Sequence, residues 1–121
     1  LNRHKKPMNG STVLFLGVAY KPDIDDARES PALLVMEQVA KKGAYVIYHD
    51  PYIPEVIDEH GHLWKGVELT DEIINSADCV VFTTNHSCFD VDHIVEKAQL
   101  VVDTRNAVKQ VHIEDGKVFK L

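Results

Sequence analysis

Short apolar runs alternate along the chain with segments whose apolar positions recur at helical spacing. The runs that predict strands cover residues 12–16, 44–49, 79–83 and 100–103. The first, third and fourth of them lack polar alternation, which is typical of strands buried on both faces of a parallel sheet. Two shorter extended segments are predicted at residues 67–69 and 118–121.

Helical signals fill the gaps between the runs. The first predicted helix covers residues 31–42, where Pro31 suits the first turn and Gly43 ends the helix. A short helix follows Thr70, and a third helix covers residues 90–97. This alternation predicts an α/β fold, built as a doubly wound, mostly parallel, Rossmann-like sheet in three layers.

Residues 51–65 follow neither period, and we predict an irregular excursion there that Tyr52 and Trp64 pin to the body of the domain. The excursion contains the close histidine pair His60 and His62. No cysteine or carboxylate set in the sequence completes a four-ligand site around that pair, so we expect surface histidines and no metal site.

The composition is typical of one soluble globular domain. The 121 residues are 45% hydrophobic and 26% charged, and no apolar run approaches the roughly 20 residues that cross a membrane. The net charge of −6 argues against a nucleic-acid-binding protein, which normally presents a basic face. We therefore expect a cytoplasmic protein with neither a membrane nor a nucleic acid as its partner.

The chain begins with Leu1 rather than methionine, so we expect a piece of a longer polypeptide. Residues 1–11 are basic and contain an Asn-Gly turn signal, which predicts a linker from a missing upstream domain. Residues 12–121 then form the single domain.

The two cysteines are too few for a disulfide scaffold. Cys79 opens an apolar run and is expected to be a buried small hydrophobe. Cys88 lies near His86, but no oxyanion-stabilising device is visible beside it, so we do not expect a catalytic nucleophile.

Ionisable side chains crowd the segment after the first predicted strand. Gly17 lets the backbone turn, and six charged residues follow before Pro31. Ligands of open α/β sheets bind outside the carboxyl ends of the strands, so Lys21, Arg28 and the later Arg105 can converge on one crevice. Arginine forks with a lysine suit a pyrophosphate. The acidic residues of the segment equally allow an ion-pair network without a ligand.

The same segment resembles a known family. Residues 17–32, GVAYKPDIDDARESPA, look like the signature that opens the C-terminal domain of the UDP-glucose/GDP-mannose dehydrogenases. The resemblance continues through YHDPY at residues 48–52, TNH at 84–86 and VVDTRN at 101–106, and covers nearly the whole chain from about Gly10. The HDPY and DTRNA versions look most like the branch that acts on UDP-N-acetyl-hexosamines.

The resemblance implies the C-terminal nucleotide-sugar-binding domain of an NAD-dependent UDP-sugar 6-dehydrogenase of polysaccharide biosynthesis. Such an enzyme oxidises the C6 alcohol of UDP-N-acetylglucosamine, UDP-N-acetylmannosamine or UDP-glucose to a carboxylate. By this resemblance Tyr20, Lys21 and Arg105 bind the UDP-sugar, and Arg28 reaches NAD on the partner domain. NAD is expected mainly on a missing N-terminal domain, and the catalytic cysteine on a missing helical domain. This chain then holds no catalytic residue, is inactive alone, and belongs to a homo-oligomeric enzyme.

The NAD fingerprint G-x-G-x-x-G is incomplete after Gly17, because Ala19 and Pro22 stand where its second and third glycines would be. We therefore do not expect this domain to bind NAD by itself.

Two other hypotheses stay open. A stand-alone regulatory module would bind a nucleotide without being part of an enzyme. A receiver-like phospho-acceptor domain would use an acid pocket, which Asp25, Asp26, Asp50 and Thr83 superficially imitate. The acid pair, however, lies well past the end of the first strand, and the late cation is Arg105 rather than a lysine.

Overall fold

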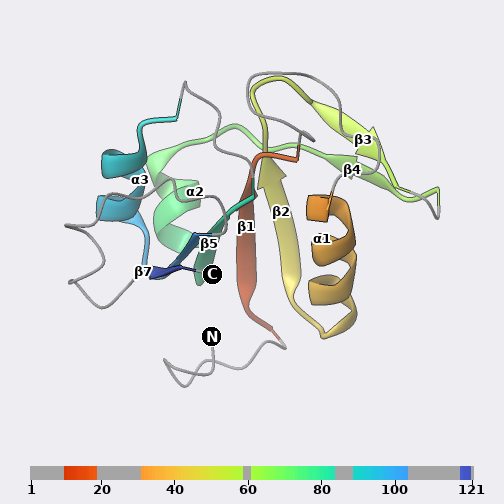
Figure 1. Cartoon of the computed structure of the whole chain (residues 1–121), viewed down its shortest axis with the longest axis horizontal. Helices are drawn as coiled ribbons and strands as arrows, with labels where there is room; N and C mark the ends of the chain where they lie inside the picture. The colour runs from red at the N-terminus through yellow and green to blue at the C-terminus, as the bar shows by residue number, and fades with distance from the viewer. Residues whose placement is uncertain (1–9, 19–30, 59–60, 84–88, 104–117, 121) are drawn as a thin grey trace.

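A parallel sheet of five strands runs through the described part of the protein (Figure 1). This computed structural model describes residues 10–18, 31–58, 61–83, 89–103 and 118–120. The strands, in spatial order, are β2 (Tyr45–His49), β1 (Thr12–Leu16), β5 (Cys79–Phe82), β6 (Val101–Asp103) and β7 (Val118–Lys120). Every neighbouring pair is parallel, which confirms the predicted sheet type.

Strand β1 lies in the interior of the sheet, and its continuous apolar sequence suits this position. It pairs with β2 on one side and with β5 on the other. Val13 and Phe15 pack into one core, whereas Leu14 and Leu16 pack into a second core. Because successive side chains of a strand point to opposite faces, an uninterrupted apolar run is the pattern that a strand covered on both faces requires.

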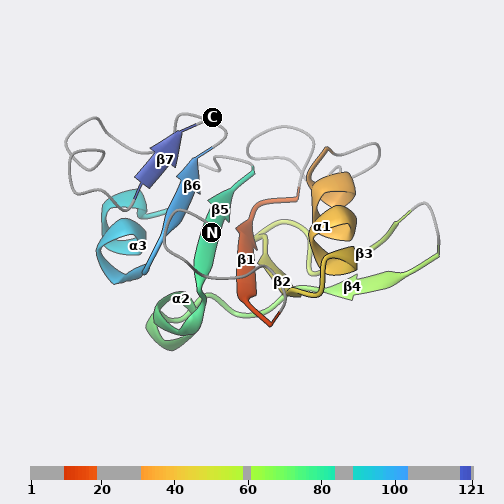
Figure 2. The same cartoon turned by 90° about the horizontal axis from the view of Figure 1, so that it is seen from below.

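Three helices in the described residues cover the two faces of the sheet. Helix α1 (Pro31–Lys41) lies on one face, and α2 (Asp71–Ser76) and α3 (Val91–Lys97) lie on the other, as Figure 2 shows. This arrangement confirms the doubly wound, three-layer prediction. None of these helices has the length and apolarity needed to cross a lipid bilayer.

Side-chain caps begin the two short helices; the cap at Thr70 was predicted, whereas Asp90 was predicted as the first residue of its helix and instead caps it. The Thr70 hydroxyl accepts a hydrogen bond from the backbone N–H of Ile73 at 3.2 Å. The Asp90 carboxylate accepts one from the N–H of His93, also at 3.2 Å. Each cap gives a partner to one of the N–H groups that a helix start leaves unpaired.

Residues 51–65 contain an antiparallel hairpin, so the prediction of an irregular excursion was wrong. Strand β3 (Glu55–Ile57) pairs with β4 (Leu63–Lys65) outside the main sheet. Val56 and Trp64 lie opposite each other and pack against the core under α1. Each strand has only three residues, so its alternation is too short to be recognised in the sequence. The hairpin is stabilised by its packing against the core.

Residues 67–69 form no strand, which corrects a second prediction. The Val67 N–H donates to the Tyr48 carbonyl at 2.8 Å, but the Val67 carbonyl faces the ring nitrogen Nδ1 of His49 at 2.8 Å. A side chain thus takes the place of the next main-chain donor, and the β-ladder does not continue. The segment still lies beside β2, and Val67 and Leu69 cover part of the second core.

Candidate functional site

The order of the strands places a switch point between β1 and β5. After β1 the chain passes to α1 on one face, and after β5 it passes to α3 on the other face (Figure 2). The connections therefore separate at the carboxyl ends of these two strands. In open α/β sheets this is the position of the ligand crevice. The described residues at this edge are Gly17, Val18, His49, Asp50, Thr83, Phe89 and Asp103.

The end of β1 is tied to both of its neighbouring strands. The Gly17 N–H donates to the His49 carbonyl at 2.9 Å, and the Thr83 N–H donates to the Leu16 carbonyl at 3.0 Å. The buried hydroxyl of Thr83 donates to the Gly17 carbonyl and lies 3.2 Å from the Leu16 carbonyl. Gly17 has a φ of 90°, a conformation in which glycine is unstrained.

Asp50 follows β2 and binds the backbone beyond β1 from the side opposite Thr83. Its carboxylate oxygen Oδ2 accepts from the Val18 N–H at 2.8 Å, and its Oδ1 accepts from the Tyr52 N–H at 2.8 Å. The side chain is buried, and carboxylates accept such charge-assisted bonds strongly. Asp50 therefore joins the start of the segment after β1 to the turn after β2.

The His49 side chain is hydrogen-bonded to the main chain at the same edge. Because the Val67 carbonyl is an acceptor, the imidazole Nδ1, 2.8 Å away, carries the hydrogen of this bond. The ring is tilted against Phe89 at a centroid separation of 6.2 Å, and Phe89 in turn meets Phe82 edge-on at 6.4 Å. Phe82, Phe89 and His49 thus form a row of neighbouring rings at this edge.

The four predicted ligand contacts, Tyr20, Lys21, Arg28 and Arg105, lie outside the described residues, as do Asp25, Asp26 and Cys88. The described strands nevertheless fix where their segments leave the sheet. Val18 lies two residues before Tyr20, and the buried Asp103 at the end of β6 lies two residues before Arg105. Strands β1 and β6 flank β5, so their carboxyl ends are roughly 10 Å apart at one edge.

The backbone N–H groups of Gly17 and Val18 already have protein acceptors and are not free to bind a pyrophosphate. In dinucleotide-binding folds the backbone N–H groups of the first turn face that group. Here the Gly17 and Val18 N–H groups are bonded to protein acceptors, and Ala19 and Pro22 replace the second and third glycines of the fingerprint.

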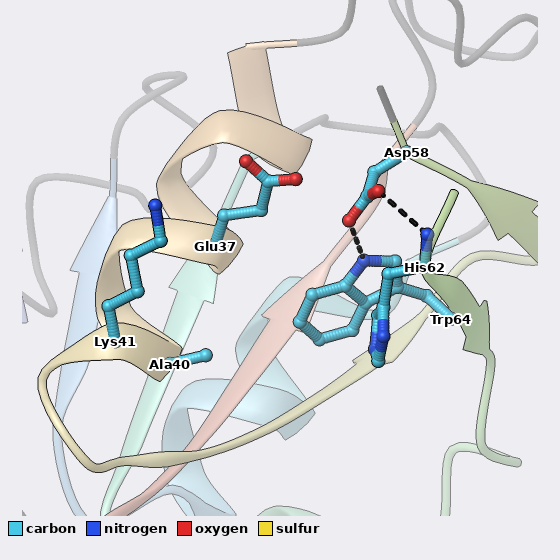
Figure 3. A pocket seen from close by; sticks show the side chains of 6 residues that line it. All are labelled: Glu37, Ala40, Lys41, Asp58, His62 and Trp64. Atoms are coloured by element: carbon cyan, nitrogen blue, oxygen red, sulfur yellow. Dashed lines mark hydrogen bonds between the residues drawn. The ribbon is translucent and has the colours of Figure 1, made fainter. Parts of the chain in front are cut away.

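A hollow of about 350 Å³ lies between α1 and the hairpin (Figure 3). Its lining residues are Glu37, Ala40, Lys41, Asp58, His62 and Trp64. The Asp58 carboxylate accepts from the Trp64 indole Nε1–H at 2.9 Å and from the His62 N–H at 3.0 Å. Trp64 packs against the core and so fastens the hairpin to the body, as predicted. Tyr52 is exposed, so the prediction that it does the same was wrong.

No group of three or more cysteine, histidine, aspartate or glutamate side chains in the described ranges could hold a metal ion. Cys79 is buried, as the sequence predicts for a small hydrophobe.

The sequence did not indicate the bracing roles of Asp50 and Thr83, which it offered only as members of an acid pocket. The available signal was their position, because each residue directly follows a strand that neighbours β1. Which backbone group each side chain meets depends on the pairing of strands that are more than thirty residues apart in the chain.

Comparison with known proteins gives matches over most of the chain. Residues 14–110 match the family model described as UDP-glucose/GDP-mannose dehydrogenase family, UDP binding domain. The UDP-N-acetyl-D-mannosamine dehydrogenase of Methanococcus maripaludis is 30% identical over 105 residues, which are 80% of this chain and 23% of that protein. The UDP-glucose 6-dehydrogenase of Rhizobium meliloti is 32% identical over 111 residues, 85% of this chain and 25% of that one.

A solved structure has the same fold. The NDP-N-acetyl-D-galactosaminuronic acid dehydrogenase of Methanosarcina mazei matches with a TM-score of 0.78 and 27% identity, over 100% of this chain and 26% of that one. The chain thus spans about a quarter of the length of these relatives. The matches favour the nucleotide-sugar hypothesis over the receiver-like one.

Proposed function

We propose that this chain, which belongs to the UDP-glucose/GDP-mannose dehydrogenase family, is the nucleotide-sugar-binding domain of an NAD-dependent UDP-sugar 6-dehydrogenase. The complete enzyme oxidises the C6 alcohol of the sugar to a carboxylate. In this proposal residues 1–11 link the domain to upstream NAD-binding and helical domains, which perform the chemistry.

The observation that carries the proposal is that the two strands preceding the predicted UDP contacts end at one edge of the sheet. The segment with Tyr20 and Lys21 follows β1, the segment with Arg105 follows β6, and both strands end beside β5. A lysine supplies a compact positive charge and an arginine a bidentate fork, which together match the diphosphate of UDP. In a domain of net charge −6, such a site must be local.

NAD is proposed as the hydride acceptor, held mainly by the upstream domain and reached from this chain by Arg28. Arg28→Ala in the complete enzyme should therefore raise the NAD requirement more than the UDP-sugar requirement. An effect confined to UDP-sugar affinity would refute this role. The 121-residue chain alone should form no NADH from NAD with UDP-glucose, UDP-N-acetylglucosamine or UDP-N-acetylmannosamine.

We further propose a UDP-N-acetyl-hexosamine as the substrate and polysaccharide biosynthesis in the cytoplasm as the setting, in a homo-oligomeric enzyme. The HDPY segment at residues 49–52 and the DTRNA segment at 103–107 support the choice of sugar. So does a relative that is named for UDP-N-acetyl-D-mannosamine. Comparing kcat/KM for this sugar nucleotide and for UDP-glucose in the complete enzyme tests the choice.

Calorimetric titration of UDP into the chain tests the binding site. A charge-assisted hydrogen bond typically contributes roughly 1.5–3 kcal/mol. Lys21→Ala and Arg105→Ala should therefore each weaken UDP binding about tenfold to a hundredfold. Arg105→Lys should recover part of the loss, because lysine keeps the charge but not the fork.

Two charge-matched variants control for the loss of a cation. Lys41→Ala, at the exposed end of α1, and Arg3→Ala, in the basic segment before β1, should leave UDP affinity unchanged. Unchanged affinity in Lys21→Ala or Arg105→Ala, with an intact circular-dichroism spectrum, would remove that residue from the site.

A further inference from the structure

The backbone at Gly17 and Val18 is the last described part of the chain before Tyr20 and Lys21. The side chains of Asp50 and Thr83 bind different atoms of this backbone. The Asp50 carboxylate binds the Val18 N–H at 2.8 Å, and the Thr83 hydroxyl binds the Gly17 carbonyl. Both contacts are buried, and they join residues 32 and 66 positions apart. The direction in which the chain leaves β1 is thus set from both sides.

We propose that Asp50 is a positioning residue for nucleotide binding, which acts by fixing the Val18 N–H and with it the point where the Tyr20–Lys21 segment leaves the sheet. Thr83 supports the same backbone through the Gly17 carbonyl. This inference rests on the proposed function, because Tyr20 and Lys21 are assigned to UDP there. Asp50 itself does not touch the nucleotide in this proposal.

The chemistry of the Asp50 contacts explains why a carboxylate is needed. Oδ2 accepts from Val18 and Oδ1 accepts from Tyr52, so both oxygens act as acceptors. Asparagine has the same shape but a single accepting oxygen, and its NH₂ group cannot accept from an N–H. Asp50→Asn therefore loses one of the two contacts while leaving the volume of the site unchanged.

Asp58 provides a matched control. It is also a buried aspartate whose two oxygens each accept from an N–H, those of His62 and Trp64. It belongs to the β3–β4 hairpin, outside the five-stranded sheet. Asp58→Asn should disturb a comparable pair of contacts without displacing the backbone that follows β1.

Titration of UDP into the full 121-residue chain decides the matter. We expect Asp50→Asn to weaken UDP binding about tenfold and Asp58→Asn to stay within about twofold of the wild type. Thr83→Val should weaken binding, and Thr83→Ser, which keeps the hydroxyl, should restore it. The Val18 amide proton should also move upfield in Asp50→Asn as its bond to a charged acceptor is lost.

The possible failures are distinguishable. Wild-type affinity in Asp50→Asn would overturn this inference alone, and so would equal losses in Asp50→Asn and Asp58→Asn, which would indicate general destabilisation. If Asp50→Asn does not fold, the Thr83 pair decides: equal UDP affinity in Thr83→Val and Thr83→Ser would overturn the inference. A wild-type chain that binds no UDP would instead overturn the proposed function and the inference with it.

Discussion

The Tyr48 hydroxyl is the most informative group to remove for testing how the hairpin is held. Tyr48 lies in β2, is fully buried, and donates to the Ile53 carbonyl at 3.1 Å, with the Trp64 carbonyl at 3.5 Å. It therefore joins β2 to the backbone just before the hairpin and to the second strand of the hairpin. Tyr48→Phe keeps the ring and removes this donor.

The expected loss follows from the burial of the acceptor. A hydrogen bond contributes roughly 0.5–1.5 kcal/mol net, and an unsatisfied buried acceptor costs about 1–3 kcal/mol. We expect Tyr48→Phe to lower the free energy of unfolding by about 1–2 kcal/mol, since the Ile53 carbonyl is left in a closed site. For a domain of this size the melting temperature should fall by roughly 4–10 °C.

Urea unfolding measures this change, with Trp64 fluorescence reporting on the hairpin and circular dichroism on the sheet. Trp64 is the sole tryptophan of the chain, so its signal is unambiguous. Tyr45→Phe is the matched control, because Tyr45 lies in the same strand and is 69% exposed. Its effect should stay within about 0.5 kcal/mol. Equal effects of the two variants would refute the assignment.

The pH dependence gives a second readout of the same hydroxyl. Burial, with the nearby charges of Asp50 and Glu55, raises the pKa of Tyr48 to about 12 from an ordinary value of 10.0. Because the folded pKa lies above the unfolded one, this contribution to stability is fully present below pH 10 and is lost as the pH rises through about 12. The stability advantage of the wild type over Tyr48→Phe should therefore shrink above pH 10. A constant difference up to pH 12 would contradict the burial argument.

Two further predictions concern the helices. Met36→Ala should lower the free energy of unfolding by about 2–5 kcal/mol in chemical denaturation, because Met36 is fully buried on the inner face of α1. Leu34→Ala, on the exposed face of the same helix, should lower it by less than about 0.5 kcal/mol. Similar losses in the two variants would contradict the assigned faces. His93 and Asp71 form a 2.7 Å ion pair between α3 and α2, whose hydrogen bond raises the pKa of His93 and lowers that of Asp71. The contribution of the pair to stability should be lost as the pH rises through the raised histidine pKa and as it falls through the lowered aspartate pKa. An NMR titration should find a lower His93 pKa in Asp71→Asn than in the wild type. An unchanged His93 pKa would argue against the pair.

The fold class was predictable because its signals are local. The continuous apolar run of β1 indicates burial on both faces, and Thr70 and Asp90 mark helix starts through side chains that reach only three residues ahead. The family resemblance likewise rests on short contiguous segments, so the sequence by itself was enough to name Tyr20 and Lys21 as candidate nucleotide-binding residues.

Contacts between distant segments required the tertiary structure. The sequence does not state that β1 lies between β2 and β5, and that arrangement is what brings Asp50 to the Val18 N–H and Thr83 to the Gly17 carbonyl. The hairpin was missed for the same reason, because three-residue strands have little periodicity of their own and are stabilised by packing against the core. Local periodicity records which face of a segment is buried, whereas the identity of the covering partner depends on strand order, which only the packed sheet decides.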